Sequence, residues 1–122
     1  MQDQPTFPAL IKEILEGIQD NKGKDITIMD LTELENSVCD YFVITTGNST
    51  TQVKSISEAV EKRVREELGD KPWHVEGADR SEWVLMDYVN AVVHVFQQDS
   101  REFYDLESLW GDAKIHHLET EY

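Results

Sequence analysis

The sequence has little cysteine, few basic residues and no long hydrophobic run, and each shortage excludes a class of protein. Cys39 is the only cysteine, so neither an internal disulfide nor a cysteine-based zinc site can form. Apolar runs such as Ala91-Val92-Val93 are far shorter than the roughly 20 residues that a membrane-spanning helix needs. Met1 to Pro5 lack the basic and apolar regions of a signal peptide. We therefore expect a soluble, cytoplasmic, single-domain protein.

The shortage of basic residues gives the chain a strongly negative charge. Its 122 residues include 25 acidic and 11 basic side chains, which leaves a net charge of −14. A field of this sign repels phosphate, so direct binding to nucleic acid through a basic patch, or to an anionic membrane, is disfavoured. The same field speeds the approach of a basic protein partner. Solubility alone is the competing explanation of the charge.

Two segments have the apolar spacing of amphipathic helices. Apolar residues recur every three or four positions over 6–20 and over 50–68. Thr6 is the expected cap of the first helix, and Ser49 or Thr50 is the expected cap of the second.

A third helix is expected near the end of the chain. Asp99 and Glu102 have the spacing of a capping box, and Gly111 would end the helix. Its buried face is expected to consist of Phe103, Leu106 and Trp110. The segment 113–122 has only a weak pattern and is expected to be a mobile tail.

Five segments are rich in β-branched and aromatic residues and are predicted to be strands: 26–31, 41–46, 73–76, 82–88 and 91–97. The second is apolar on both faces, as in the interior of a covered sheet. Val89-Asn90 stands at hairpin spacing between the last two. The element order predicts an α/β (α+β) fold, with a mixed sheet of about five strands flanked by helices.

The search for chemistry finds no catalytic, cofactor or metal site. Gly47-Asn48-Ser49 follows a strand and opens a helix, which can bind an anion, but no phosphate-binding motif accompanies it. We favour a turn with a helix cap. Asp30 and Asp40 lack the paired arrangement of a nucleotidyl-transfer magnesium site. His94 is interpreted as a partly buried, hydrogen-bonded histidine, and Cys39 as a small apolar residue.

The strand over 82–88 carries the most informative pattern. With a period of two, one face presents Trp83, Leu85 and Asp87, and the other presents Val84, Met86 and Tyr88. An aromatic anchor beside acidic residues is typical of a protein-binding surface. If helices covered both faces of the sheet, Trp83 would instead be part of the core.

Four segments together resemble the ribosomal silencing factors, also called the Iojap-like family. The first runs from Asp40 to Ser49 and continues with Gln52-Val53, which is similar to the central signature of the family. The others follow in the order of the family: Glu76-Gly77 before Trp83–Tyr88, then Val93–Phe96, then Arg101–Trp110. The match extends from the first helix to about Lys114.

The resemblance implies a fold, a domain and a mode of action. It implies a nucleotidyltransferase-like shape that lacks the catalytic residues. The protein is therefore expected not to be an enzyme and not to bind a cofactor. One silencing-factor domain would occupy 1–114, with a tail over 115–122. The implied function is to bind the large ribosomal subunit through large-subunit ribosomal protein fourteen, block joining of the small subunit and repress translation.

The resemblance also implies where the partner binds. The family contacts its partner through the sheet surface around the tryptophan-bearing strand, which corresponds here to Trp83, Leu85, Asp87, Tyr88 and Glu76. A role in large-subunit biogenesis needs the same surface and stays open. A nucleotide-binding or nucleotidyltransferase-like enzyme is the alternative from another class. An exposed apolar patch could also pair with a second copy in a homodimer of the free protein.

Overall fold

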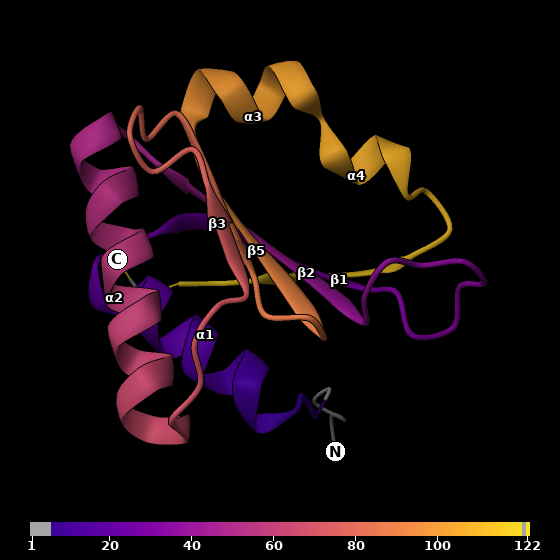
Figure 1. Cartoon of the computed structure of the whole chain (residues 1–122). Coiled ribbons are helices and arrows are strands. Elements are labelled where there is room, and N and C mark those ends of the chain that lie inside the picture. Colours follow the sequence, from indigo (N-terminus) through magenta and orange to yellow (C-terminus); the bar gives the residue numbers. More distant parts are fainter. Residues whose placement is uncertain (1–5, 121) are drawn as a thin grey trace.

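The computed structural model describes residues 6–120 and 122, which form four helices and six strands (Figure 1). The helices are α1 (Ala9–Asp20), α2 (Thr50–Leu68), α3 (Gln98–Tyr104) and α4 (Leu106–Leu109). The strands are β1 (Lys24–Asp30), β2 (Tyr41–Gly47), β3 (His74–Glu76), β4 (Trp83–Asp87), β5 (Ala91–Gln97) and β6 (Lys114–Leu118).

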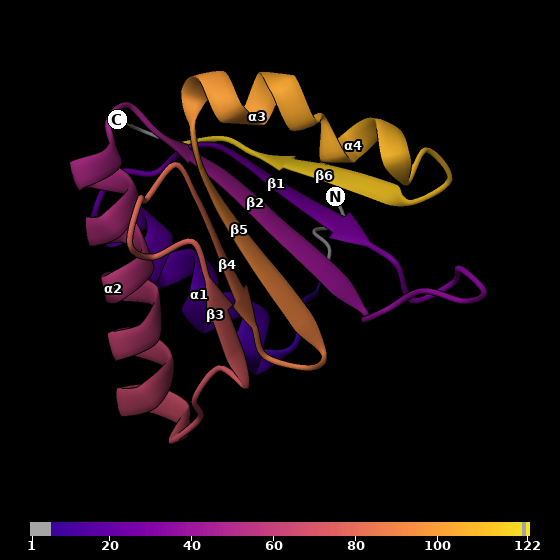
Figure 2. The same ribbon diagram turned by 45° about the horizontal axis from the view of Figure 1, so that its top comes forward.

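The strands form one mixed sheet in the order β3-β4-β5-β2-β1-β6. β2 and β5 pair in parallel at its centre, and the other neighbours are antiparallel. Helices α1 and α2 pack side by side against one face, and α3 and α4 lie over the other face (Figures 1 and 2). The predicted α+β class is therefore confirmed.

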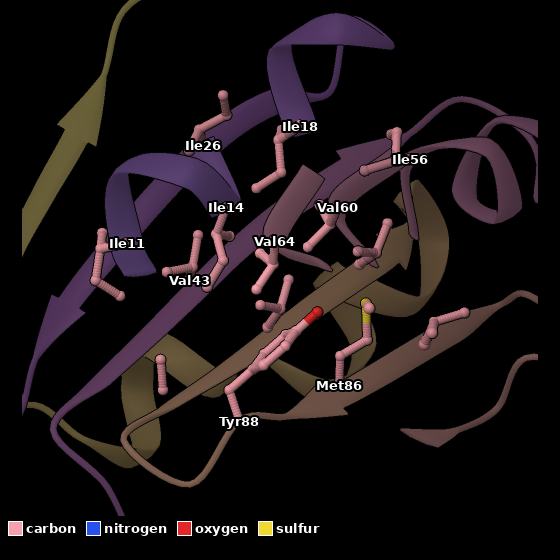
Figure 3. Packing of buried hydrophobic residues seen from close by; sticks show 14 of the residues in the cluster. Ile11, Ile14, Ile18, Ile26, Val43, Ile56, Val60, Val64, Met86 and Tyr88 are labelled. Atoms are coloured by element: carbon pink, nitrogen blue, oxygen red, sulfur yellow. The ribbon is translucent and has the colours of Figure 1, made fainter. Parts of the chain in front are cut away.

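The main core lies between the sheet and the pair α1–α2. Figure 3 shows the apolar stripes of both helices meeting side chains of the sheet. In α2 the stripe is buried because its residues recur at helical spacing, and Ser49 caps the helix by accepting the Gln52 amide N–H at 3.1 Å. The helix ends at Gly69, which adopts a φ of 65°. The predicted range 50–68 is confirmed.

The first helix begins later than the sequence predicts. It starts at Ala9, and Pro8 occupies the capping position with φ −57°. A proline at this point restricts the preceding Phe7 to extended conformations, so the helix cannot reach back to Thr6. The expected Thr6 cap is wrong.

The expected C-terminal helix is broken at Asp105. This residue adopts a φ of 45°, ends α3 and precedes α4. The break also removes the common face that was expected for the helix: Leu106 is buried, but Phe103 is 81% exposed. Gln97, rather than Asp99, caps α3, and its side-chain oxygen accepts the Asp99 N–H at 3.2 Å.

The segment expected to be a mobile tail instead adds a sixth strand. β6 pairs antiparallel with β1, from Ile26 opposite Leu118 to Asp30 opposite Lys114. Its sequence does not alternate clearly, because backbone pairing with β1 holds an edge strand whose side chains are half-buried or exposed. The sheet therefore extends beyond the boundary expected at residue 114.

We predict that Gly17→Ala destabilises the fold. Gly17 is buried where α1 crosses α2, and an added Cβ would lie 2.7 Å from the Val60 Cα. Backbone atoms of Val60 cannot move aside as the end of a flexible side chain can, so the two helices must separate. We expect the free energy of unfolding to fall by roughly 1–3 kcal/mol. Urea unfolding measures the loss. Gly111→Ala is the matched control, since an added Cβ there meets nothing within 4 Å; equal stabilities would contradict the prediction.

Candidate protein-binding surface

β4 presents its two faces to different surroundings. Val84 and Met86 are each 1% exposed on the core face, which α2 covers at this strand, whereas Trp83, Leu85 and Asp87 are half-buried on the opposite face. The predicted alternation is therefore confirmed. Trp83 contacts Tyr104 of α3, so its face is the one over which α3 and α4 lie; Figure 2 shows the position of these two helices.

Strand pairing brings an acidic residue beside this face. Glu76 of β3 stands opposite Leu85, and Leu85 stands opposite His94 of β5. Directly paired residues in antiparallel strands share a face. Glu76, Trp83, Leu85 and Asp87 consequently form one surface, here called the Trp83 surface, with an apolar centre and two carboxylates.

Tyr88 does not belong to the Trp83 surface. Only 4% of this residue is exposed, and it packs in the main core with Val64 and Met86, as Figure 3 shows. Burial also raises the pKa of the Tyr88 phenol. The period of two places it on the core face, so it cannot contact a partner beside Trp83. The expectation that Tyr88 contacts the partner is therefore wrong.

The Trp83 indole is held by three neighbours from two other elements. It stacks on Phe96, with the ring centroids 4.8 Å apart. It also contacts the ring of Tyr104 in α3, with the ring centroids 4.5 Å apart. Its indole N–H donates to Nδ1 of His94 at 3.1 Å. The ring is therefore pre-oriented, and its polar atom is used inside the protein. What remains for a partner is the apolar part of the ring.

His94 is the polar support of this arrangement. It is buried, and burial lowers its pKa to about 4, so the imidazole is neutral near pH 7. Its Nδ1 accepts the hydrogen bond from the indole N–H, so Nε2 carries the ring hydrogen of the neutral imidazole. Nε2 has no hydrogen-bond partner among the described residues. The expectation of a buried histidine is confirmed, but only one of its nitrogens is paired.

The turn at Gly47-Asn48-Ser49 uses its own side chains to satisfy its amides. The Asn48 N–H donates to Oε1 of Gln52 at 2.7 Å, and Ser49 caps α2. The Gln52 amide group also donates to the carbonyl of Asn21 at 3.2 Å. The geometry is that of a turn followed by a helix cap, which is the interpretation preferred from the sequence.

The potential metal ligands and the Cys39 thiol were the other chemical groups considered from the sequence. No group of three or more potential metal ligands occurs among residues 6–120 and 122. Burial raises the pKa of the Cys39 thiol to about 11, so it stays protonated near pH 7. No helix in the described ranges is long and apolar enough to cross a membrane.

Sequence reasoning did not identify the three residues that hold Trp83. His94 and Phe96 alternate along β5 and so share a face, a signal that the pattern of the strand contains. Tyr104 has no such signal, because its contact with Trp83 depends on where α3 crosses the sheet.

We predict that His94 makes stability depend on pH below neutrality. Its pKa falls from 6.5 to about 4 on folding, so the unfolded chain takes up the proton first as the pH decreases. Stability is therefore lost from pH 6.5 towards pH 4, by about 3 kcal/mol. Urea unfolding at several pH values should show this loss in the wild type.

His94→Gln tests the assignment, because an amide oxygen can still accept the indole N–H but does not titrate. The variant should lack this part of the pH dependence. His74→Gln is the control, since the His74 side chain is 59% exposed. If the wild type and His94→Gln lose stability in parallel, another group is responsible.

Comparison with known proteins places the chain in a family. Residues 4–121 match the family described as "Ribosomal silencing factor during starvation". "Ribosomal silencing factor RsfS" of Bacillus subtilis (strain 168) is 37% identical over 111 residues, which cover 91% of this chain and 92% of that protein.

Two further matches extend the comparison. A crystal structure of a protein from Chromobacterium violaceum superposes with a TM-score of 0.79 at 35% identity and covers 91% of both chains. The mouse protein "Mitochondrial assembly of ribosomal large subunit protein 1" is 28% identical over 95 residues, covering 76% of this chain and 41% of that protein. The family match spans nearly the whole sequence and the crystal structure shares its fold, so the chain belongs to the family of ribosomal silencing factors.

Proposed function

We propose that this protein binds the large ribosomal subunit through large-subunit ribosomal protein fourteen, blocks joining of the small subunit and so represses translation. The observation that carries the proposal is the pre-oriented Trp83 indole, half-buried on a sheet face with carboxylates beside it. Membership of the silencing-factor family supports a partner on the ribosome.

The Trp83 surface has the composition of a hot spot. Binding energy at protein interfaces concentrates on a few aromatic or arginine anchors that neighbouring residues shield from water. Stacking on Phe96 and the hydrogen bond to His94 hold the indole before a partner arrives. A fixed anchor loses little conformational freedom on binding, which favours affinity.

Charge favours a ribosomal protein over ribosomal RNA as the direct contact. The net charge is −14, and Glu76 and Asp87 lie on the Trp83 surface itself. RNA phosphates would be repelled, whereas a basic protein would be attracted and steered towards this surface. Inhibition would then be steric, since occupying the partner is sufficient to obstruct the second subunit.

A role in large-subunit biogenesis is the second candidate. The name of the mouse relative refers to assembly of the mitochondrial large ribosomal subunit. The same surface and partner would serve both roles, with the protein binding earlier. Binding to immature large subunits but not to mature ones would favour biogenesis over silencing.

We predict that Trp83→Ala weakens binding to the purified ribosomal protein by roughly 2 kcal/mol or more, as expected for an interface anchor. Calorimetry measures the affinity, and circular dichroism verifies that the variant is folded. Trp73→Ala is the matched control, because Trp73 is 82% exposed and precedes β3. A folded Trp83→Ala with wild-type affinity would show that the interface lies elsewhere.

The joining of purified subunits tests the proposed function as a whole. Wild-type protein added before the small subunit should reduce the monosome peak in a sucrose gradient, and Trp83→Ala should reduce it much less. Unchanged joining at a saturating concentration of the wild type would reject the silencing mechanism.

A further inference from the structure

The outer side of α3 and α4 leaves large apolar side chains in water. Phe103 is 81% exposed, Leu109 is 71% exposed and Tyr104 is 47% exposed. Each of the seven residues of α3 is at least partly exposed, although the helix lies over the sheet. Phe103 and Tyr104 contact each other, and adjoining exposed apolar side chains of this kind mark a surface that another molecule covers.

These side chains continue the aromatic surface around Trp83. The Tyr104 ring lies 4.5 Å from the Trp83 ring, and the Phe103 ring meets Tyr104 edge-on at 5.1 Å. The aromatic row thus extends without a gap from Phe96 through Trp83 and Tyr104 to Phe103. A molecule seated on Trp83 would meet α3 next.

Arg101 holds α3 on the sheet. Its guanidinium donates to the hydroxyls of Thr27 and Thr46, both at 2.9 Å, and to the backbone carbonyl of Asp25. It also pairs with Glu107 of α4 at 3.2 Å, and its side chain is only 13% exposed. The cation of α3 is therefore turned inward and paired with a carboxylate, while the Phe103 ring of the same helix is exposed.

The charge of this segment matches that of the Trp83 surface. Asp99, Glu102 and Asp105 accompany the outward rings, and the Arg101 cation is paired with Glu107. The Trp83 surface and the exposed side of α3 therefore both present aromatic side chains among carboxylates. A basic protein surface with apolar groups at its centre complements both.

We propose that α3 is the second half of the docking surface, with Phe103 and Tyr104 contacting the same ribosomal protein as Trp83. Arg101 acts as a positioning residue that keeps this half in place. The proposal rests on the proposed function and adds to it a contact region outside the sheet. The occupant is one basic protein that spans β4 and α3.

The test measures affinity for purified large-subunit ribosomal protein fourteen. Phe103→Ala should weaken binding tenfold or more while the melting temperature stays unchanged, because the side chain makes few contacts in the free protein. Val38→Ala is the control: Val38 is 72% exposed and lies in the connection between β1 and β2. It should bind as the wild type does.

The outcomes separate this proposal from the proposed function. Failure of the wild type to bind would reject the proposed function itself. If Trp83→Ala binds weakly but Phe103→Ala binds like the wild type, the proposal that α3 contacts the ribosomal protein is rejected, and the proposed function stands.

A double variant tests the positioning role of Arg101. If Arg101 acts by placing α3, then Arg101→Ala should weaken binding, and adding Phe103→Ala should have little further effect. Arg101→Lys should restore binding only in part, because a lysine ammonium cannot reproduce the planar arrangement of N–H donors in the arginine guanidinium. Fully additive losses would overturn the positioning role.

Discussion

The parallel pairing of β2 with β5 is the constraint on which the rest of the fold depends. Seven residues of each strand stand in register, from Tyr41 opposite Ala91 to Gly47 opposite Gln97, and both strands are buried almost throughout. A parallel pair needs a long crossover, which here contains α2 and the strands β3 and β4. Because both faces of the pair are apolar, both need a cover, and the chain provides two unequal ones.

The inequality of the two covers gives the molecule its binding face. Helices α1 and α2 cover one side with long apolar stripes, and Gly17 lets their backbones come close. The other side is covered by the short segment α3–α4, which Arg101 and a few aromatic contacts hold in place, and by apolar residues of the connection between β1 and β2. Trp83 lies where this smaller cover ends, so it is supported from within and is half-exposed.

How much of the site could be predicted depended on whether its geometry was local. The faces of β4 follow from a period of two, so the alternation of residues along this strand is enough to place Trp83 with Leu85 and to separate Tyr88 from them. Tyr104 could not be placed in this way, since the position of α3 depends on the hydrogen bonds that Arg101 makes to the distant strands β1 and β2. Strand β6 was missed for a similar reason: its pairing with β1 uses backbone groups, which every residue carries.

The sequence by itself determined the composition class, the extent of α2, the central strands and the apolar and acidic character of the strand that carries Trp83. These properties depend on neighbouring residues and on the sum of charges. Only the tertiary structure decided which face of the sheet stays open, that His94 accepts a hydrogen bond from the Trp83 indole and that α3 continues the aromatic surface. These features depend on strand register and on packing between elements that are far apart in the chain. The local sequence pattern determines neither of them.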